Sequence, residues 1–213
     1  MSSSPRDRRL QRDLAVLEQL RRDSAIFDFR FDPRSRPEQP ELYRLRFMGK
    51  GLALQPRKLR KPQVVIQPDH EVLLHLVAAY PRSAPHLKWL TPIYHPNIAR
   101  TGAVCLGGFG THWSPGIQLD QLCEMLWDMC RWRNFDVANP YDREAAVWAR
   151  QQPVSAFPVD TRELRSGRRD VDSAAVETKP PQPSHRAEPM LAEFAVRPNR
   201  PPTSPTTDIT FLD

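Results

Sequence analysis

The stretch IYHPNIARTGAVCLGGFGTHWSP, Ile93 to Pro115, combines a His-Pro-Asn triplet, one cysteine and a Trp-Ser-Pro sequence. Proline and glycine recur through it, so the pattern predicts turns and extended chain rather than a helix. Cys105 follows Asn97 by eight positions. A structural cysteine would more naturally lie on a helix or a buried strand. The stretch is therefore the first candidate for a reactive site.

The chain has 213 residues, of which 39% are apolar, and this length favours a single domain with one core and an appendage. Its three cysteines are too few, and odd in number, for a disulfide framework. No apolar run near the N-terminus is long enough for a signal peptide or a membrane span. We therefore expect a reduced, cytoplasmic protein without a membrane partner.

Hydrophobic periodicity predicts helices on both sides of the quoted stretch. Leucines at positions 10, 14, 17 and 20 predict an amphipathic helix over about residues 6–23. A third helix should start near Asp142. Between them, a second helix is indicated by apolar residues at steps of three and four: Leu119, Leu122, Cys123, Leu126, Met129 and Cys130. The two cysteines of this helix are expected to be small buried hydrophobes rather than metal ligands.

Four extended segments lie between the first two helices, over residues 26–32, 41–49, 70–80 and 86–94. In the second of them, alternation places Tyr43, Leu45 and Phe47 on one face, as a half-buried strand requires. The last two are separated by a proline-containing turn. The pattern therefore predicts two strand pairs.

The composition changes after Pro153, because the last 61 residues hold ten prolines and only isolated apolar clusters such as LAEFAV and ITFL. Such a composition does not form a core of its own. We expect a domain over residues 1–152 and a largely disordered tail over residues 153–213. The alternative is that the tail carries short docking motifs.

Positive charge is concentrated in residues 30–61, which hold ten Arg and Lys against three Asp and Glu. The densest part contains Arg57, Lys58, Arg60 and Lys61. A solvated, arginine-coated loop and a surface that docks an acidic protein partner are about equally favoured. A nucleic-acid surface is the weakest interpretation, because no stacking aromatic residues are interleaved there.

The order of these elements and motifs resembles the ubiquitin-conjugating (E2) enzymes over about residues 8–152. The matching residues stand in fixed register: Thr91, Ile93, Tyr94, His95, Pro96, Asn97, Ile98, Gly102, Cys105, Leu106, Trp113, Ser114 and Pro115. The resemblance implies the α/β (α+β) UBC fold of that family. In that fold an N-terminal helix precedes a four-stranded antiparallel sheet, and helices follow it.

The resemblance also implies an activity. Cys105 would accept the C-terminal carboxylate of a ubiquitin-like protein from an E1-like activating enzyme, hold it as a thioester and pass it to an amine, such as a lysine of a protein substrate. Sulfur suits this chemistry because a thiolate is a good nucleophile at neutral pH and also a good leaving group. No metal or organic cofactor is implied.

Supporting roles follow from the same resemblance. Asn97 would order the neighbouring loop and stabilise the oxyanion that forms when an amine attacks the thioester. His95 would brace the turn by hydrogen bonding rather than act as a base. Pro96 would fix the backbone, and Trp113 would pack the active-site loop from beneath.

Departures from the family pattern occur near the site. The position before Pro140, where the family often has an acidic residue, holds Asn139, and Asp136 is the nearby candidate to replace it.

By resemblance and charge, the first helix, with Arg12, and the basic residues at 57–61 are the candidate E1-docking surface. The long segment 50–70, the tail and the arginine-rich coding are similar to E2-like proteins of bacterial conjugation operons linked to phage defence. A eukaryotic member stays open.

Alternatives to this interpretation concern the same few residues. Cys105 could be an inert loop thiol, and Asn97 a simple turn residue. His95 with Cys105 could form a cysteine-protease dyad, but the sequence offers no convincing third member to orient it. A non-enzymatic E2-variant module that binds a ubiquitin-like partner is the main rival, and such variants lack the cysteine.

Overall fold

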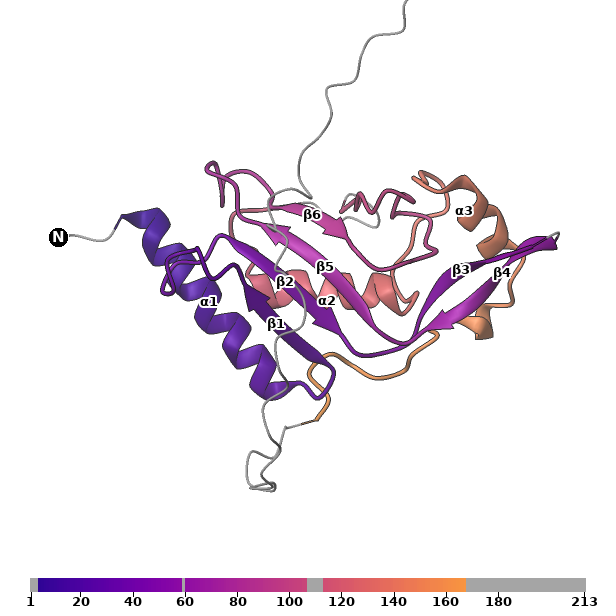
Figure 1. The fold of residues 1–213 in the computed structure, drawn as a ribbon, viewed down its shortest axis with the longest axis horizontal. Helices are drawn as coiled ribbons and strands as arrows, with labels where there is room; N and C mark the ends of the chain where they lie inside the picture. Colours follow the sequence, from indigo (N-terminus) through magenta and orange to yellow (C-terminus); the bar gives the residue numbers. More distant parts are fainter. Residues whose placement is uncertain (1–3, 59, 107–112, 168–213) are drawn as a thin grey trace, which may run out of the picture. The chain divides into compact units, whose positions relative to one another are not determined.

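The computed structural model describes residues 4–58, 60–106 and 113–167, all within one compact unit. The tail segments LAEFAV and ITFL lie outside the described residues. In the described part of the chain, no helix is both long and apolar enough to cross a membrane. Figure 1 shows the helices and strands along the chain.

A four-stranded antiparallel sheet forms the centre of the fold, as the sequence predicts. Its strands are β1 (Phe27–Phe31), β2 (Leu42–Phe47), β5 (His70–His75) and β6 (His86–Trp89), in the order β1-β2-β5-β6. The predicted face of β2 is confirmed, because Tyr43, Leu45 and Phe47 are all fully buried. The period-two pattern therefore identifies both the strand and its core side.

The three predicted helices are α1 (Pro5–Asp23), α2 (Leu119–Cys130) and α3 (Arg143–Arg150). Ser4 and Asp7 form a reciprocal capping box at the start of α1. Asp142 caps α3 by accepting a hydrogen bond from the Ala145 N–H at 3.0 Å. All six apolar positions predicted for the core face of α2, including both of its cysteines, are buried.

The main core lies between the sheet and helices α1 and α2. At its centre the Phe47 ring lies between two tryptophans, with centroid distances of 6.5 Å to Trp89 and 6.3 Å to Trp127. A second, smaller core underlies α3 and is formed around the fully buried Trp132. Large aromatic side chains therefore contribute much of the buried area in both cores.

The basic segment, for which a solvated loop and a docking surface were about equally favoured, is a β-hairpin made of β3 (Gly51–Arg57) and β4 (Arg60–Gln67). The base of the hairpin is anchored, because Leu52 and Ala53 are buried and the Leu52 carbonyl accepts a hydrogen bond from the Tyr94 N–H at 2.7 Å. Its distal half is exposed. Pro56 and Pro62 weaken the strand signal in the sequence, since proline is tolerated only in edge strands such as these.

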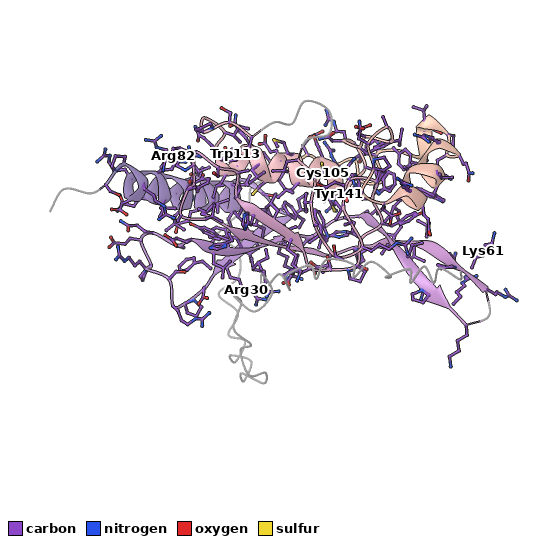
Figure 2. The ribbon with its side chains drawn as sticks, turned by 90° about the horizontal axis from the view of Figure 1, so that it is seen from above. Arg30, Lys61, Arg82, Cys105, Trp113 and Tyr141 are labelled. Carbon is purple, nitrogen blue, oxygen red and sulfur yellow. The ribbon has the colours of Figure 1, made fainter. Side chains whose placement is uncertain are left out.

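The hairpin and α1 lie at opposite ends of the sheet (Figure 1). Figure 2 shows Lys61 at the tip of the hairpin, at the end opposite α1. Helix α1 packs against β1 and α2. The first helix and the basic residues at 57–61 therefore do not form one continuous patch, and each stays a separate candidate for the E1 contact.

Residues 153–167 pack on the domain, so the boundary expected at residue 152 falls inside the packed region. The side chain of Leu164 is 2% exposed. The Phe157 ring stacks on Trp132 at 4.9 Å between centroids, and the Trp127 indole N–H donates to the Arg162 carbonyl at 2.8 Å. Composition alone did not predict this, because the anchoring residues are few and widely spaced.

Candidate active site

A tight turn in the backbone places the candidate nucleophile. Gly102 has φ of +89°, and a Cβ at this position would lie 2.1 Å from the Trp89 carbonyl oxygen. Only glycine fits such a position without a shift of the backbone. The chain then runs back antiparallel to the His-Pro-Asn turn, with a bridge between Ile98 and Val104. As a result the Cys105 N–H donates a hydrogen bond to the Asn97 carbonyl at 2.9 Å.

The three cysteines differ sharply in accessibility. Cys105 is partly exposed, whereas Cys123 and Cys130 are fully buried in α2. Burial raises the pKa of the Cys123 and Cys130 thiols well above their usual value, because a buried thiolate is poorly solvated. Cys105 is therefore the only one of the three that a partner protein can reach.

His95 is fully buried and uses both of its ring nitrogens. Nδ1 accepts a hydrogen bond from the Asn97 N–H at 3.1 Å, and Nε2 donates to the Asn134 carbonyl at 3.2 Å. Burial lowers the pKa of His95 to about 3, so the ring is neutral. No ring nitrogen remains to take a proton from Cys105 in this geometry. The arrangement argues against a cysteine-protease dyad. The two hydrogen bonds of the ring instead hold the turn in place.

Asn97 is 2% exposed and holds the loop that precedes α3. Its Oδ1 accepts a hydrogen bond from the Asp136 N–H at 2.7 Å, and its Nδ2 donates to the Asp136 carbonyl at 2.9 Å. This pairing with both backbone groups of one residue fixes the orientation of the amide. Because an amide nitrogen carries two hydrogens, one donor remains for another acceptor.

Asp136 and Asn139 lie together on that loop. The Asp136 carboxylate accepts hydrogen bonds from the Ala138 N–H at 2.7 Å and from the Asn139 side chain at 3.2 Å. The backbone hydrogen bond from Ala138, followed by that from Asn139, lowers the pKa of Asp136. The structure thus places a carboxylate on the loop that Asn97 holds.

Tyr141 is the site residue that sequence reasoning missed. The Pro96 carbonyl accepts hydrogen bonds from the N–H groups of Tyr141, at 2.7 Å, and of Asp142, at 2.9 Å. The Tyr141 side chain is 55% exposed and lies beside Cys105 (Figure 2). The nearby Cys105 side chain raises the pKa of Tyr141. Its position directly after Pro140, in a segment already aligned with the family, is the signal that could have identified it.

Trp113 contacts the turn between β5 and β6. Its indole N–H donates to the Pro81 carbonyl at 2.8 Å, and its ring lies 5.7 Å from the Tyr80 ring. The expected role of Trp113 beneath the active-site loop stays a prediction, because residues 107–112 of that loop lie outside the described residues.

The basic residues Arg57, Lys58, Arg60 and Lys61 are all exposed at the tip of the hairpin. Among the described residues, no carboxylate forms an ion pair with any of the four, and Arg57 instead donates a hydrogen bond to Gln63. Arginines of the main sheet, in contrast, form ion pairs. Arg44, for example, pairs with Glu71 at 3.1 Å. The hairpin tip therefore carries four exposed positive charges that no carboxylate in the described part of the chain neutralises.

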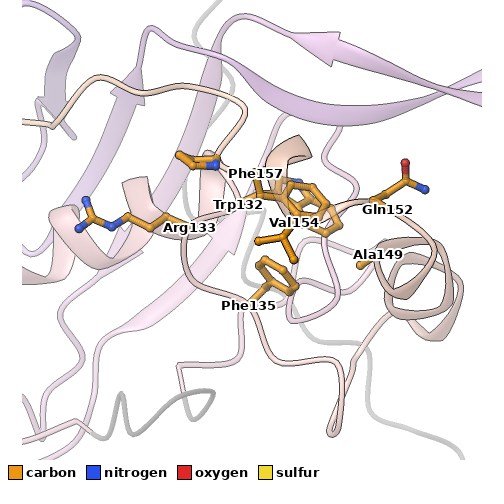
Figure 3. A pocket seen from close by; sticks show the side chains of 8 residues that line it. Trp132, Arg133, Phe135, Ala149, Gln152, Val154 and Phe157 are labelled. Carbon is orange, nitrogen blue, oxygen red and sulfur yellow. The ribbon is translucent and has the colours of Figure 1, made fainter.

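An apolar pocket of about 270 Å³ lies beside the second core. Figure 3 shows the rings of Trp132, Phe135 and Phe157 gathered with Val154, and Arg133 extending to one side. Neither Cys105 nor Tyr141 lines this pocket. Within the residues described, no group of three or more His, Cys, Asp or Glu side chains could hold a metal ion.

In a comparison with protein families, residues 69–162 match the model of the family described as ubiquitin-conjugating enzyme. Among curated proteins, ubiquitin-conjugating enzyme E2 13 of Saccharomyces cerevisiae is 49% identical over 49 residues, which are 23% of this chain and 32% of that protein. Ubiquitin-conjugating enzyme E2 16 of Schizosaccharomyces pombe is 34% identical over 85 residues, 39% of this chain and 52% of that protein. The chain thus spans about a third to a half of the length of these relatives.

Among solved structures, S. cerevisiae Ubc12 aligns with a TM-score of 0.51 and 19% identity, over 72% of this chain and 75% of that chain, a likeness that supports the fold. Fold and site together define an α/β domain that presents one accessible cysteine beside a His-Pro-Asn turn. Over residues 69–162 the chain is similar to the ubiquitin-conjugating enzyme family.

Proposed function

We propose that this chain is an E2-type conjugating enzyme. It accepts a ubiquitin-like protein from an E1-like enzyme as a thioester on Cys105 and transfers that protein to an amine, such as a lysine of a protein substrate. The observation that carries the proposal is the position of Cys105, the one accessible thiol of the chain, hydrogen-bonded through its backbone to Asn97 in a domain that matches the family.

The chemistry has two acyl transfers. In the first, the Cys105 thiolate attacks the thioester held by the E1, a new C–S bond forms, and the E1 thiolate leaves. In the second, an amine attacks the acyl carbon, a C–N bond forms, the Cys105 thiolate leaves, and the amine proton passes to solvent. A partly exposed cysteine suits both steps, because two large partners must reach it in turn.

Asn97 and the Asp136 loop support the second transfer. One Nδ2 hydrogen of Asn97 holds the Asp136 carbonyl, and the other is the candidate donor to the oxyanion. Asp136, with Asn139 beside it, supplies the carboxylate that helps to position the incoming ammonium group. His95 and Pro96 keep the turn in place.

Three protein partners follow from this function: an E1-like enzyme, a ubiquitin-like modifier and the substrate. The basic hairpin tip around residues 57–61 is the candidate surface for an acidic partner, because its charges are exposed and no carboxylate among the described residues pairs with them. Arg12 is exposed on α1 and is a separate candidate for the E1 contact. A nucleic-acid role for the hairpin stays the weaker alternative.

A non-enzymatic E2-variant module is the rival function, and the accessible Cys105 disfavours it. The context of a bacterial conjugation operon linked to phage defence stays a prediction. Genes for an E1-like protein and a ubiquitin-like protein next to the gene for this chain would support it.

Thioester formation tests the proposed function directly. The protein is incubated with ATP and either ubiquitin and the E1 that activates it, or the E1-like and ubiquitin-like proteins encoded by neighbouring genes. We expect a conjugate that thiol reductant dissolves. Cys105→Ser should give a conjugate that resists reductant but is cleaved by alkali, because the bond becomes an oxygen ester.

Two variants serve as controls for this assay. Cys105→Ala should form no conjugate, and Cys123→Ala should load normally because that thiol is buried. A conjugate that reductant dissolves and that persists in Cys105→Ala would contradict the assignment of the nucleophile.

A further inference from the structure

A buried polar network lies on the core face of α1, among the leucines of that helix. Asp13 is only 1% exposed, like Leu10 and Leu17 on either side of it in the sequence. Its carboxylate accepts hydrogen bonds from Arg9 Nε, at 3.0 and 2.9 Å, and from the Tyr80 hydroxyl at 2.6 Å. A buried ion pair is often no more stabilising than apolar side chains of similar volume. Its presence here therefore points to a role in orienting a side chain.

The rest of the Arg9 guanidinium contacts a distant segment of the chain. One terminal nitrogen donates to the Pro115 carbonyl at 2.6 Å, and the other donates to the Ile117 carbonyl at 2.5 Å and to the Tyr80 hydroxyl at 2.7 Å. Both carbonyls belong to a turn that the Ile117 N–H closes by donating to the Ser114 carbonyl at 2.9 Å. The planar fork of arginine lets one side chain hold a carboxylate and two carbonyls together.

The residue before this turn is held at the same place. The Trp113 ring lies 5.7 Å from the Tyr80 ring, and its indole N–H donates to the Pro81 carbonyl at 2.8 Å. Residues 113–117 lead the chain from the region of Cys105 into α2. In the view of Figure 2, Trp113 lies between α1 and Cys105. Residues 113–117 therefore connect α1 with the candidate active site.

We propose that Arg9 is a positioning residue of the conjugating reaction. Oriented by Asp13 and Tyr80, it fixes residues 113–117 on α1 and so keeps that helix and Cys105 in a defined relative position. The inference rests on the proposed function for its effect on loading, but not for its effect on residues 113–117.

Loading is the step that needs this alignment. An E1 that contacts α1, where Arg12 is exposed, must at the same time bring its thioester to Cys105. A shift of either surface relative to the other lowers the fraction of encounters in which the reacting atoms meet. A small reagent that contacts Cys105 alone does not depend on α1.

The test compares loading with alkylation in Arg9→Lys. Lysine keeps a positive charge beside Asp13, but it lacks the planar fork that reaches both carbonyls of the turn. We expect kcat/KM for loading by the E1 to fall about fivefold to tenfold. The rate of Cys105 alkylation by iodoacetamide should stay at about the wild-type value, because the thiol and its immediate surroundings are unchanged.

Arg6→Lys is the matched control. Arg6 lies in the same helix and donates to the backbone carbonyls of Leu76 and Val77 at 3.2 and 3.3 Å. The same substitution there removes similar hydrogen bonds without affecting residues 113–117, so loading should proceed at the wild-type rate.

Three results would overturn the proposal. Loading of Arg9→Lys at the wild-type rate would mean that a positive charge alone is sufficient. Alkylation that slows in parallel with loading would mean that the thiol itself is disturbed. Equally slow loading in Arg6→Lys would mean that any arginine of this helix has the same effect.

The indole N–H signal of Trp113 tests the structural part without an E1 or a modifier. In nuclear magnetic resonance spectra of protein carrying isotope-labelled tryptophan, Trp113→Phe identifies that signal by its loss. We expect the signal to shift in Arg9→Lys, while those of Trp127 and Trp148 stay in place. An unchanged Trp113 signal would overturn the link between Arg9 and residues 113–117. If the wild-type protein forms no thioester, the proposed function fails, and a shifted Trp113 signal would still support that link.

Discussion

At the scale of single residues, Asn97 joins the two halves of the site. Its side chain makes two hydrogen bonds to the backbone of Asp136, which is 39 positions away, and its carbonyl holds the Cys105 N–H. The sequence suggested an amide donor for an oxyanion. The structure adds a second duty, because the same amide orders the loop that carries Asp136 and Asn139.

The two duties of Asn97 are separable by single-turnover assays. Loading needs the Cys105 thiolate and an activated carboxyl, whereas discharge builds negative charge on the thioester oxygen. Asn97→Ala should therefore load almost normally but discharge to free lysine roughly a hundredfold more slowly. The free energy of unfolding should also fall by about 1–3 kcal/mol, because the backbone groups of Asp136 lose their hydrogen-bond partners. The melting temperature of the variant should be lower as a result.

A matched variant distinguishes loop ordering from oxyanion stabilisation. Arg150 donates a hydrogen bond to the Val137 carbonyl on the same loop but does not contact Asn97. Arg150→Ala should loosen the loop and leave discharge close to the wild-type rate. Equal losses of loading and discharge in Asn97→Ala, or an equally slow discharge in Arg150→Ala, would mean that Asn97 acts only through the structure of the loop.

At the scale of elements, the β3–β4 hairpin has a buried base and an exposed, charged tip. Leu52 and Ala53 fix the base against the domain, so charge at the tip contributes little to the stability of the fold. Exposed charges without partners attract oppositely charged proteins and raise association rates at low salt. The hairpin is thus suited to an encounter with an acidic partner.

Neutralisation of the tip should affect binding rather than folding. In the variant with Arg57, Lys58, Arg60 and Lys61 all changed to Gln, we expect a change in stability of about 0.5 kcal/mol or less per site. Loading should require a several-fold higher E1 concentration for half-maximal rate, and its salt dependence should weaken. Steady-state loading at two ionic strengths measures both quantities.

Arg12→Gln reports separately on α1, because that helix lies at the other end of the sheet. Unchanged loading at every salt concentration in the hairpin variant would exclude the tip as an E1 contact. Salt-dependent retention of an oligonucleotide by the wild type, lost in the same variant, would favour the nucleic-acid alternative instead.

At the scale of the whole molecule, residues 153–167 pack against the rest of the domain and complete it. Arg131 is 1% exposed, and its guanidinium pairs with Glu163 at 2.7 Å and donates to the Arg162 carbonyl at 3.0 Å. A buried charge that loses one of its partners is strongly destabilising. The chain that follows α3 is therefore part of the folded unit and not of the tail.

Truncation of the chain tests whether residues 153–167 stabilise the domain. A chain that ends at residue 152 loses Phe157, Glu163 and Leu164, and we expect it to be destabilised by about 3 kcal/mol or more. A chain that ends at residue 167 should melt like the full-length protein. Thermal unfolding followed by circular dichroism compares the three, and a chain ending at 152 that melts at the full-length temperature would refute the structural role of this segment.

The sequence by itself determined the local elements. Helices α1, α2 and α3 and the four strands of the main sheet follow from apolar periodicity and turn residues, because these signals act between neighbours in the chain. The role of Cys105 as nucleophile was implied by the family resemblance and stays a prediction. The sequence also indicated that Cys105 and Asn97 belong to one site, and the structure brings their backbones together. This could be predicted because both residues lie in one continuous turn-rich stretch.

Only the tertiary structure decided which distant residues meet. Tyr141 lies at the His-Pro-Asn turn because the Pro96 carbonyl accepts a hydrogen bond from its N–H, and Asn97 faces Asp136 because the second core brings that loop to the turn. The same holds for the separation of α1 from the hairpin and for the packing of residues 153–167. The physical reason is that these contacts depend on the packing of large buried side chains such as Trp127 and Trp132, whose partners along the chain no local pattern specifies.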